Sequence, residues 1–514
     1  MAERELKKTV CDICMARCGV DAWVEDGVLV SVEGSKDCAN GGKLCVKGYL
    51  QREYLYRPDR IRTPLRRTGA RGKGRFEPIS WEEAYREIAE RLNGIKAESG
   101  ADSVAFFSGY TKWYRTMFHR FVHAFGTQNY GTESSSCFQA ARLADILNAG
   151  SLSRPDIAHA DLFLAWGFNP FYSGVHTNRL IEAQRAKGMK ILCVDPRVTP
   201  FSQMADLHLR IRSGSDGALA LFFGNYLIQN GAVDLEYINQ YVHGYAKYGT
   251  YVRQFTPERT ERITGIPKAQ LLEAAELIAD SPRFSINLSG AAIPHHVNGM
   301  QNCRAVLSLL ALTGNFDREG GNLPTEFTND KRNLKAEWDK FVDEVRPLSS
   351  DGSGYQNSSA WRHRNPAFQW EGRKTCLPKI GSQRFPVWSE IVDEFQSMDL
   401  ARQIEEGTPY PIRALFALGL NRRMFLENDR LMEAVKSLDF FVDVDLFWTD
   451  AARQADIVLP ACSSLERAEL QTVGPKLRYI KPAIPPLYQS KSDVDILSEL
   501  ARAMELPDPL RMST

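Results

Sequence analysis

The sequence predicts an α/β protein in which a small N-terminal β domain with clustered cysteines precedes two similar parallel-sheet domains. Three observations support this prediction. Five of the ten cysteines lie within the first 45 residues. Residues 158–212 alternate strand, Gly/Pro loop, helix and strand, a pattern typical of a parallel sheet. Part of this stretch is repeated at residues 444–456, which indicates two related units in one chain.

Composition and charge exclude several classes of protein. A chain of 514 residues is too long for one hydrophobic core and predicts several domains. Its 43% hydrophobic and 25% charged residues are those of a soluble globular protein, not of a disordered or fibrous one. The net charge of +1 argues against a nucleic-acid or anionic-lipid partner. No apolar run approaches the roughly 20 residues that cross a bilayer. The N-terminus lacks a signal-peptide core and a twin-arginine pair, so we expect a cytoplasmic protein.

The N-terminal cysteines are spaced like metal ligands. Cys11, Cys14 and Cys18 lie close together, and Cys45 follows after a long gap. Cytoplasmic cysteines stay reduced, and this spacing matches a cubane iron–sulfur cluster, which takes one cysteine per iron. Zinc is the competing metal, although structural zinc sites usually combine two short Cys-x2–4-Cys pairs and only one such pair is present here. Cys38 could replace Cys45 as fourth ligand, but we expect it to be a loop thiol.

Local patterns predict the elements that follow. Residues 21–34 predict a β-hairpin that turns at its Asp-Gly pair. Residues 80–95 begin with a capping-box pattern and continue with helical spacing of apolar residues. Residues 104–109 predict a buried strand that ends in a glycine loop, followed by a helix through Phe125. Residues 325–385 have weak periodicity and predict a long insertion or loop.

The repeat involves two pairs of segments. Residues 194–206 match residues 444–456 without a gap and share Val, Asp, Thr, Ala and Asp at the same five offsets. Upstream, residues 164–170 correspond to residues 416–422, and both contain a Gly-x-Asn turn. Glycine at the carboxyl end of a parallel strand lets backbone N–H groups approach a phosphate, and an acid ending the next strand can take a ribose hydroxyl or a base edge. Two copies predict two nucleotides, or one dinucleotide that spans both halves.

The cysteine cluster and the duplicated unit together resemble the molybdopterin-dependent oxidoreductase superfamily typified by dimethyl sulfoxide reductase. The resemblance covers essentially the whole chain. Besides the four cysteines, it is carried by Cys45-Val-Lys-Gly, Ile79-Ser-Trp-Glu-Glu-Ala, Gly167-Phe-Asn-Pro, Val194-Asp-Pro-Arg, Gly214-Ser-Asp, Gly314-Asn-Phe and Ala455-Asp-Ile-Val-Leu-Pro-Ala. Two mild departures are Ser215, where the family usually has threonine, and Arg422, where the second copy often has proline.

This resemblance implies a [4Fe–4S] cluster and two molybdopterin guanine dinucleotides, one on each α/β half, with molybdenum or tungsten between their dithiolenes. Lys47 matches the family lysine between cluster and pterin, where a cation would stabilise the added electron. The residues that match dinucleotide contacts are Gly167, Asn169, Pro170, Asp195, Pro196, Arg197, Thr199, Gly214 and Asp216 in the first half, and Gly419, Asn421, Asp445 and Thr449 in the second. Asp216 could equally cap a helix that begins at Gly217.

The fifth ligand of the molybdenum or tungsten is expected to be Cys137. It stands at the family's ligand position and at a predicted loop-to-helix junction, which favours a thiolate. Soft thiolate suits a metal already bound by dithiolene sulfur. Ser136 is the second choice as ligand, and Cys137 could instead be a buried structural cysteine. His296 and His176 are candidate proton donors or substrate contacts, and each could instead be a satisfied loop histidine.

The implied function is an oxidoreductase that passes electrons between a small-molecule substrate at the metal and the cluster, and then to an electron-transfer partner. Phe138 follows Cys137, where formate dehydrogenases have histidine and nitrate reductases tend to have methionine, which counts against both enzymes. Two competing functions are a non-redox, acetylene-hydratase-like enzyme that uses the metal as a Lewis acid, and a degenerate electron-transfer or scaffold subunit. Met15 stands where acetylene hydratase has an acid, which weakens that mechanism.

The expected domains follow the resemblance. They are a [4Fe–4S] domain at 1–60, a central domain at 61–150 and 320–400 with the metal-ligand loop, a first dinucleotide domain at 151–320 and a second at 401–514. In the family a C-terminal β-barrel normally follows at this point. We therefore expect a separate subunit to supply the missing C-terminal domain, a truncated chain, or a site that stays more open than usual.

Overall fold

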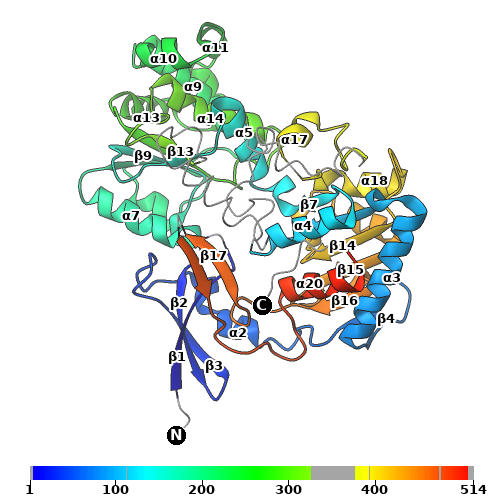
Figure 1. Ribbon diagram of the computed structural model, residues 1–514. Helices are drawn as coiled ribbons and strands as arrows, with labels where there is room; N and C mark the ends of the chain where they lie inside the picture. The colour runs from blue at the N-terminus through cyan, green and yellow to red at the C-terminus, as the bar shows by residue number, and fades with distance from the viewer. Residues whose placement is uncertain are drawn as a thin grey trace. The chain divides into compact units, whose positions relative to one another are not determined.

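The protein is described by a computed structural model. It covers residues 4–14, 16–110, 113–325, 377–392, 394–473 and 476–506. The chain divides into two compact units (Figure 1). Unit 1 comprises residues 1–136 and 336–514, and unit 2 comprises residues 137–335. Most of the predicted insertion at 325–385 lies outside the described residues.

An antiparallel sheet forms the N-terminal part of unit 1 (Figure 1). Its strands, in spatial order, are β1 (Arg4–Val10), β2 (Gly19–Glu25) and β3 (Val28–Gly34). The turn between β2 and β3 is the predicted hairpin turn, and its residues Asp26 and Gly27 both have positive φ, as a type I′ turn requires. Two short helices follow, α1 (Val46–Tyr49) and α2 (Gln51–Leu55). The small β domain predicted at the N-terminus is confirmed.

A seven-stranded sheet is the centre of unit 1. In spatial order its strands are β5 (Phe76–Pro78), β4 (Leu65–Arg67), β16 (Ile457–Pro460), β15 (Phe440–Asp445), β14 (Ala414–Leu418), β6 (Val104–Ser108) and β7 (Tyr130–Thr132). The five strands from β16 to β7 are parallel, whereas β4 and β5 pair antiparallel at one edge. Because β6 pairs with β14, two segments about 300 residues apart in the sequence build one sheet.

Helices cover both faces of this sheet because its buried side chains alternate between two hydrophobic clusters. Phe106 and Phe416 face α3 (Trp81–Ser99), α4 (Arg115–Phe125) and α20 (Asp493–Ala503). Phe107 and Leu415 face α18 (Leu400–Glu406) and α19 (Asn428–Ala434). The capping box at Ser80 is confirmed, and α3 extends four residues beyond the predicted end. The described part of the unit also contains α17 (Pro386–Ile391), β17 (Glu469–Val473) and β18 (Lys476–Ile480).

Asp493 at the start of α20 is a buried carboxylate that makes the stability of the protein depend on pH. Burial raises its pKa to about 6, against the opposing effect of Arg467. The folded carboxyl thus holds its proton more tightly than the unfolded one, whose pKa is about 3.9. The stability that it contributes is therefore full below about pH 4 and is lost as the pH rises to about 6.

Replacing Asp493 with asparagine, which stays neutral, is expected to stabilise the protein by about 2 kcal/mol at pH 8 and to change little at pH 4. Denaturant unfolding at the two pH values measures the difference. A loss of stability of equal size at both would show that the carboxylate contributes mainly through its contacts.

Unit 2 is built on a four-stranded parallel sheet. Its strands, in spatial order, are β11 (Leu207–Leu209), β10 (Lys190–Val194), β9 (Leu162–Trp166) and β12 (Phe284–Leu288). The side chains of β9 alternate between two hydrophobic clusters on opposite faces of this sheet. A short antiparallel pair joins β8 (Ser153–Pro155) to β13 (Asn322–Pro324).

Helices lie on both sides of this sheet. They are α5 (Gln139–Ala149), α6 (Pro170–Ser173), α7 (Val175–Arg185), α8 (Pro200–Met204), α9 (Asp216–Gln229), α10 (Leu235–Tyr241), α11 (Tyr245–Val252), α12 (Pro257–Thr264), α13 (Lys268–Ala279) and α14 (Gly299–Leu312). The predicted α/β class is confirmed. Within the described ranges, no helix combines the length and apolarity needed to cross a bilayer.

Candidate functional site

Four cysteines from two segments of unit 1 meet at one pocket. Cys11, Cys14 and Cys18 come from the loop between β1 and β2, and Cys45 precedes α1. All four line the same pocket, together with Lys47. The remaining lining residues are Ile13, Leu44 and Gly48. The pocket therefore brings together the predicted cluster ligands and the lysine predicted to lie beside them.

Cys38 does not line this pocket. Its thiol packs against Gly19, where an added Cβ would lie 2.3 Å from the sulfur. It is absent from the residues that line the pocket, whereas Cys45 is among them. This geometry favours Cys45 over Cys38 as the fourth ligand.

Two thiols of the pocket, those of Cys11 and Cys18, are costly to ionise without a cation. Burial, with smaller contributions from the neighbouring cysteines, raises the pKa of Cys11 to about 12 and that of Cys18 to about 11. Four thiolates here need a positively charged partner, and iron supplies that charge.

The two predicted repeat units have the same backbone hydrogen bond at their glycine turns. The N–H of Gly167 donates to the carbonyl of Val194, and the N–H of Gly419 donates to that of Val444, both at 2.8 Å. The two glycines have φ of 64° and 73°, a backbone region that disfavours other residues. The turn that each sequence unit predicts is thus present at the carboxyl end of a parallel strand.

The acid and the threonine shared by the repeats cap the following turns. The Oδ1 of Asp195 accepts from the N–H of Arg197 at 2.8 Å, and that of Asp445 accepts from the corresponding N–H of Phe447 at 3.3 Å. The hydroxyls of Thr199 and Thr449 each accept from an N–H three residues later, at 3.0 Å. These side chains therefore shape the loops, and any contact with a ligand would use their remaining lone pairs.

The last shared residues, Asp206 and Asp456, also have matching roles, which the sequence did not assign. Their carboxylates accept from the N–H groups of Ile191 and Phe441, both at 2.8 Å. They hold the start of β10 and of β15. The shared Ala-Asp pair was the only sequence signal for this role.

No sequence pattern indicated Asp443, a fully buried carboxylate below the second turn that accepts from the N–H of Leu420 at 3.3 Å.

The two Gly-x-Asn turns differ in the state of their asparagines. The Oδ1 of Asn421 accepts from the N–H of Arg423 at 3.0 Å. Asn169 is 7% exposed, and neither polar atom of its side chain has a hydrogen-bond partner among the described residues. A buried amide without partners costs free energy, and a bound polar ligand removes that cost. The first unit thus fits a polar ligand at its turn.

Of the other residues predicted nearby, Pro170 begins α6, and Pro196 and Arg197 are exposed.

Gly214, Asp216 and His296 lie together in unit 2. Gly214 has a φ of 84°, and an added Cβ would lie 2.5 Å from Nε2 of His296. Asp216 accepts from the indole N–H of Trp166 at 2.8 Å, and burial raises its pKa. The alternative role of Asp216 as a helix cap is not found, because α9 begins at Asp216 and its N-cap is Ser215. The strand residue Trp166 binds this carboxylate instead.

The predicted histidines occupy different settings. Nδ1 of His296 accepts from the N–H of Asn298 at 3.2 Å, and the residue is exposed. His176 lies near the start of α7, where burial and the nearby Arg179 lower its pKa. A neutral imidazole at neutral pH is able to accept a proton.

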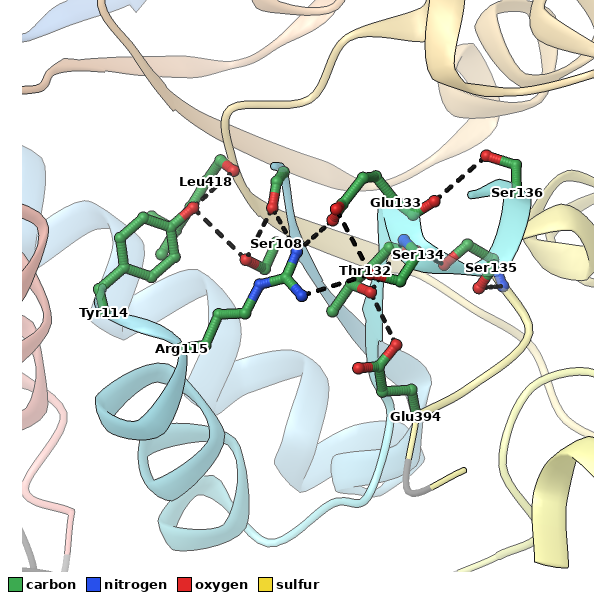
Figure 2. Close-up of polar contacts among 12 residues, drawn as sticks. Ser108, Tyr114, Arg115, Thr132, Glu133, Ser134, Ser135, Ser136, Glu394 and Leu418 are labelled. Carbon is green, nitrogen blue, oxygen red and sulfur yellow. Dashed lines mark hydrogen bonds and ion pairs between the residues drawn. The ribbon is translucent and has the colours of Figure 1, made fainter. Parts of the chain in front are cut away.

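The loop that leads to Cys137 is fixed by a buried polar network in unit 1 (Figure 2). Arg115 at the start of α4 pairs with Glu133 and donates to the carbonyl of Gly109 at 2.7 Å. The hydroxyl of Thr132 donates to Glu394 at 2.7 Å. The hydroxyl of Ser136 donates to the carbonyl of Met424 at 2.5 Å, so this second-choice ligand is engaged by the backbone.

Cys137 itself follows this network. It lies in a turn between the 3-10 helix Glu133–Ser136 and α5, which begins at Gln139. Its side chain is partly buried. Three further cysteines, Cys193, Cys303 and Cys462, are buried, and burial raises the pKa of each to about 12. Cys376 lies outside the described residues.

Known proteins resemble this chain over nearly its whole length. The probable oxidoreductase YoaE of Bacillus subtilis is 29% identical over 98% of this chain and 69% of its own. The thiosulfate reductase molybdopterin-containing subunit PhsA of Salmonella typhimurium is 27% identical, over 98% and 64%. Formate dehydrogenase H of Escherichia coli is 28% identical, over 97% and 68%. The chain thus spans about two thirds of the length of these relatives.

A solved structure and two family models complete the comparison. Acetylene hydratase from Pelobacter acetylenicus shares the fold, with a TM-score of 0.82 and 23% identity over 98% of this chain and 70% of its own. The model of the molybdopterin oxidoreductase Fe4S4 domain matches residues 5–57, and that of molybdopterin oxidoreductase matches residues 60–503. The chain belongs to the molybdopterin oxidoreductase family of enzymes and begins with that family's Fe4S4 domain.

Proposed function

We propose that this chain is a molybdenum- or tungsten-dependent oxidoreductase that passes electrons between a small-molecule substrate and a [4Fe–4S] cluster. The observation that carries the proposal is the pocket lined by Cys11, Cys14, Cys18, Cys45 and Lys47. Its four thiols fit a cubane with one cysteine per iron. Lys47 places a cation beside it, and a cation stabilises the additional negative charge of a reduced cluster.

The two glycine turns are the proposed seats of two pterin guanine dinucleotides. Gly167 and Gly419 open the turns for phosphate, and the partnerless Asn169 supplies a donor and an acceptor to the ligand. When bound, the metal–dithiolene centre supplies the two-electron couple at which substrate reacts. Cys137 is the proposed protein ligand of that metal, held in place by the network around Glu133. His296 and His176 are the proposed groups that contact substrate or exchange its protons.

An electron-transfer subunit is the proposed partner. Two observations support it. The thiosulfate reductase relative is named as the molybdopterin-containing subunit of its enzyme, and an F420-dependent formate dehydrogenase relative is named as subunit alpha. Both names describe one chain of a larger enzyme. The cytoplasm is the proposed location.

Asn169 offers a test of the proposed dinucleotide site. Replacing it with leucine, which has a similar shape, removes no hydrogen bond within the described residues. We expect the cofactor-free protein to keep its stability within about 0.5 kcal/mol, or to gain stability. The purified protein is expected to lose bound dinucleotide, measured as guanine nucleotide released by acid hydrolysis.

Asn322 is the matched control for this experiment. It is also a buried asparagine of unit 2, but its amide accepts from the N–H of Ile286 and donates to the carbonyl of Ile286 and to Ser153. Replacing Asn322 with leucine is expected to cost about 2 kcal/mol of unfolding free energy. An unchanged guanine content in the Asn169→Leu variant would contradict the assigned site.

A further inference from the structure

A largely buried group of four charged residues is connected to the cysteine loop through Asp12. Asp12 stands between Cys11 and Cys14, and its carboxylate binds Arg467 at 2.8 Å and Arg17 at 3.2 Å. Glu469 at the start of β17 binds Arg17 at 3.2 Å and Arg467 at 3.6 Å. We name these residues Asp12, Arg17, Arg467 and Glu469 the charge quartet. It joins the cysteine loop to a segment about 450 residues away in the sequence.

The members of the quartet are shielded from water. The side chains of Asp12 and Arg467 are 5% exposed, that of Glu469 is 3% exposed and that of Arg17 is 21% exposed. Water and salt therefore screen these charges far less than they screen a surface ion pair. Since Asp12 stands between Cys11 and Cys14 in the sequence, the charges paired with it are expected to act on a group held by these cysteines with little screening.

Arg467 is the more firmly held of the two cations. Besides its carboxylate partners, it donates to the carbonyl of Cys462 at 3.3 Å. Its guanidinium lies over the ring of Trp113, 4.3 Å from the ring centroid. The positive charge of Arg467 is thus fixed in place rather than carried on a mobile side chain.

We propose that the charge quartet sets the reduction potential of the cluster, with Arg467 raising it and Glu469 lowering it. The inference rests on the proposed function, in which the four cysteines hold a [4Fe–4S] cluster. Reduction adds one electron to that cluster, and no bond forms or breaks. The added negative charge is stabilised by a buried cation and destabilised by a buried carboxylate. Arg467 and Glu469 are positioning residues in this account, since neither lines the pocket.

Opposite charge changes within the quartet test this inference. The full chain is purified without oxygen and titrated with dithionite at about pH 8.5, where Glu469, whose pKa burial raises to about 7, is ionised. The reduced cluster is followed by EPR. At the potential where half of the wild-type clusters are reduced, we expect fewer than about one tenth to be reduced in Arg467→Met. Arg467→Lys keeps the charge and is expected to restore most of the reduced fraction. Glu469→Gln is expected to raise the reduced fraction well above one half.

The sign of the change separates an electrostatic role from a structural one. Arg402 of α18 is the control, since it also forms an ion pair with a buried aspartate, at 2.6 Å. Arg402→Met is expected to leave the cluster potential unchanged. Equal reduced fractions in all variants, or shifts in the same direction for Arg467→Met and Glu469→Gln, would overturn the inference while leaving the proposed function intact. A wild-type protein with no cluster signal would overturn both.

Discussion

Replacing Cys45 with serine is expected to remove the cluster from this protein. Cys45 lines the same pocket as Cys11, Cys14 and Cys18, and it is the one proposed ligand that the second segment contributes. A serine hydroxyl is a poor donor for iron, and three cysteines leave one iron of a cubane without its thiolate. We expect bound iron and inorganic sulfide to fall by at least about tenfold, since losing even a supporting residue of a metal site costs that much.

Cys38→Ser is the matched control for this substitution. Cys38 is a nearby cysteine in the same small domain, but its thiol packs against Gly19 instead of lining the pocket. We expect this variant to retain the iron and sulfide of the wild type. If Cys38→Ser lost the cluster while Cys45→Ser kept it, the assignment of the fourth ligand would be reversed.

Replacing Cys137 with serine is expected to have the second large effect, on the molybdenum or tungsten. Cys137 follows a segment that is held by contacts of Arg115, Glu133 and Thr132, so its backbone position is defined before a metal binds (Figure 2). Thiolate matches the softness of a metal bound by dithiolene sulfur, and an alcohol does not. We expect metal retention to fall by at least about tenfold, measured by elemental analysis of the purified protein.

Ser136→Ala provides the control beside it. The hydroxyl of Ser136 already donates to the carbonyl of Met424, so its loss removes a loop contact rather than a metal ligand. We expect this variant to bind molybdenum or tungsten like the wild type. Retention of metal by Cys137→Ser together with its loss from Ser136→Ala would show that the ligand had been assigned to the wrong residue.

Features that depend on short stretches of sequence could be predicted. The spacing of Cys11, Cys14 and Cys18 predicts that they lie together, because a loop of this length brings its cysteines close, and all three line one pocket in the structure. The hairpin at Asp26 and the helix after Ser80 formed where turn and capping chemistry indicated. The glycine turns of both repeats could be predicted because the residues shared by the two segments make equivalent hydrogen bonds in each.

Features that depend on distant partners could not be predicted. Nothing near Val104 in the sequence indicates that β6 pairs with β14, since strand order in a sheet follows the whole topology. The ion pair between Asp12 and Arg467 joins residues 455 positions apart for the same reason. The local pattern around Asp216 allows either a dinucleotide contact or a helix cap, and only the fold places Trp166 beside its carboxylate.

The most direct test of the account is the metal and cofactor content of the wild-type chain, purified without oxygen. The account predicts about four irons with matching sulfide, together with one molybdenum or tungsten and two guanine nucleotides per chain. After reduction, EPR is expected to show both the cluster and the rhombic signal of a pentavalent metal. Zinc on the cysteines, or a cluster without molybdenum, tungsten or guanine nucleotide, would contradict the account.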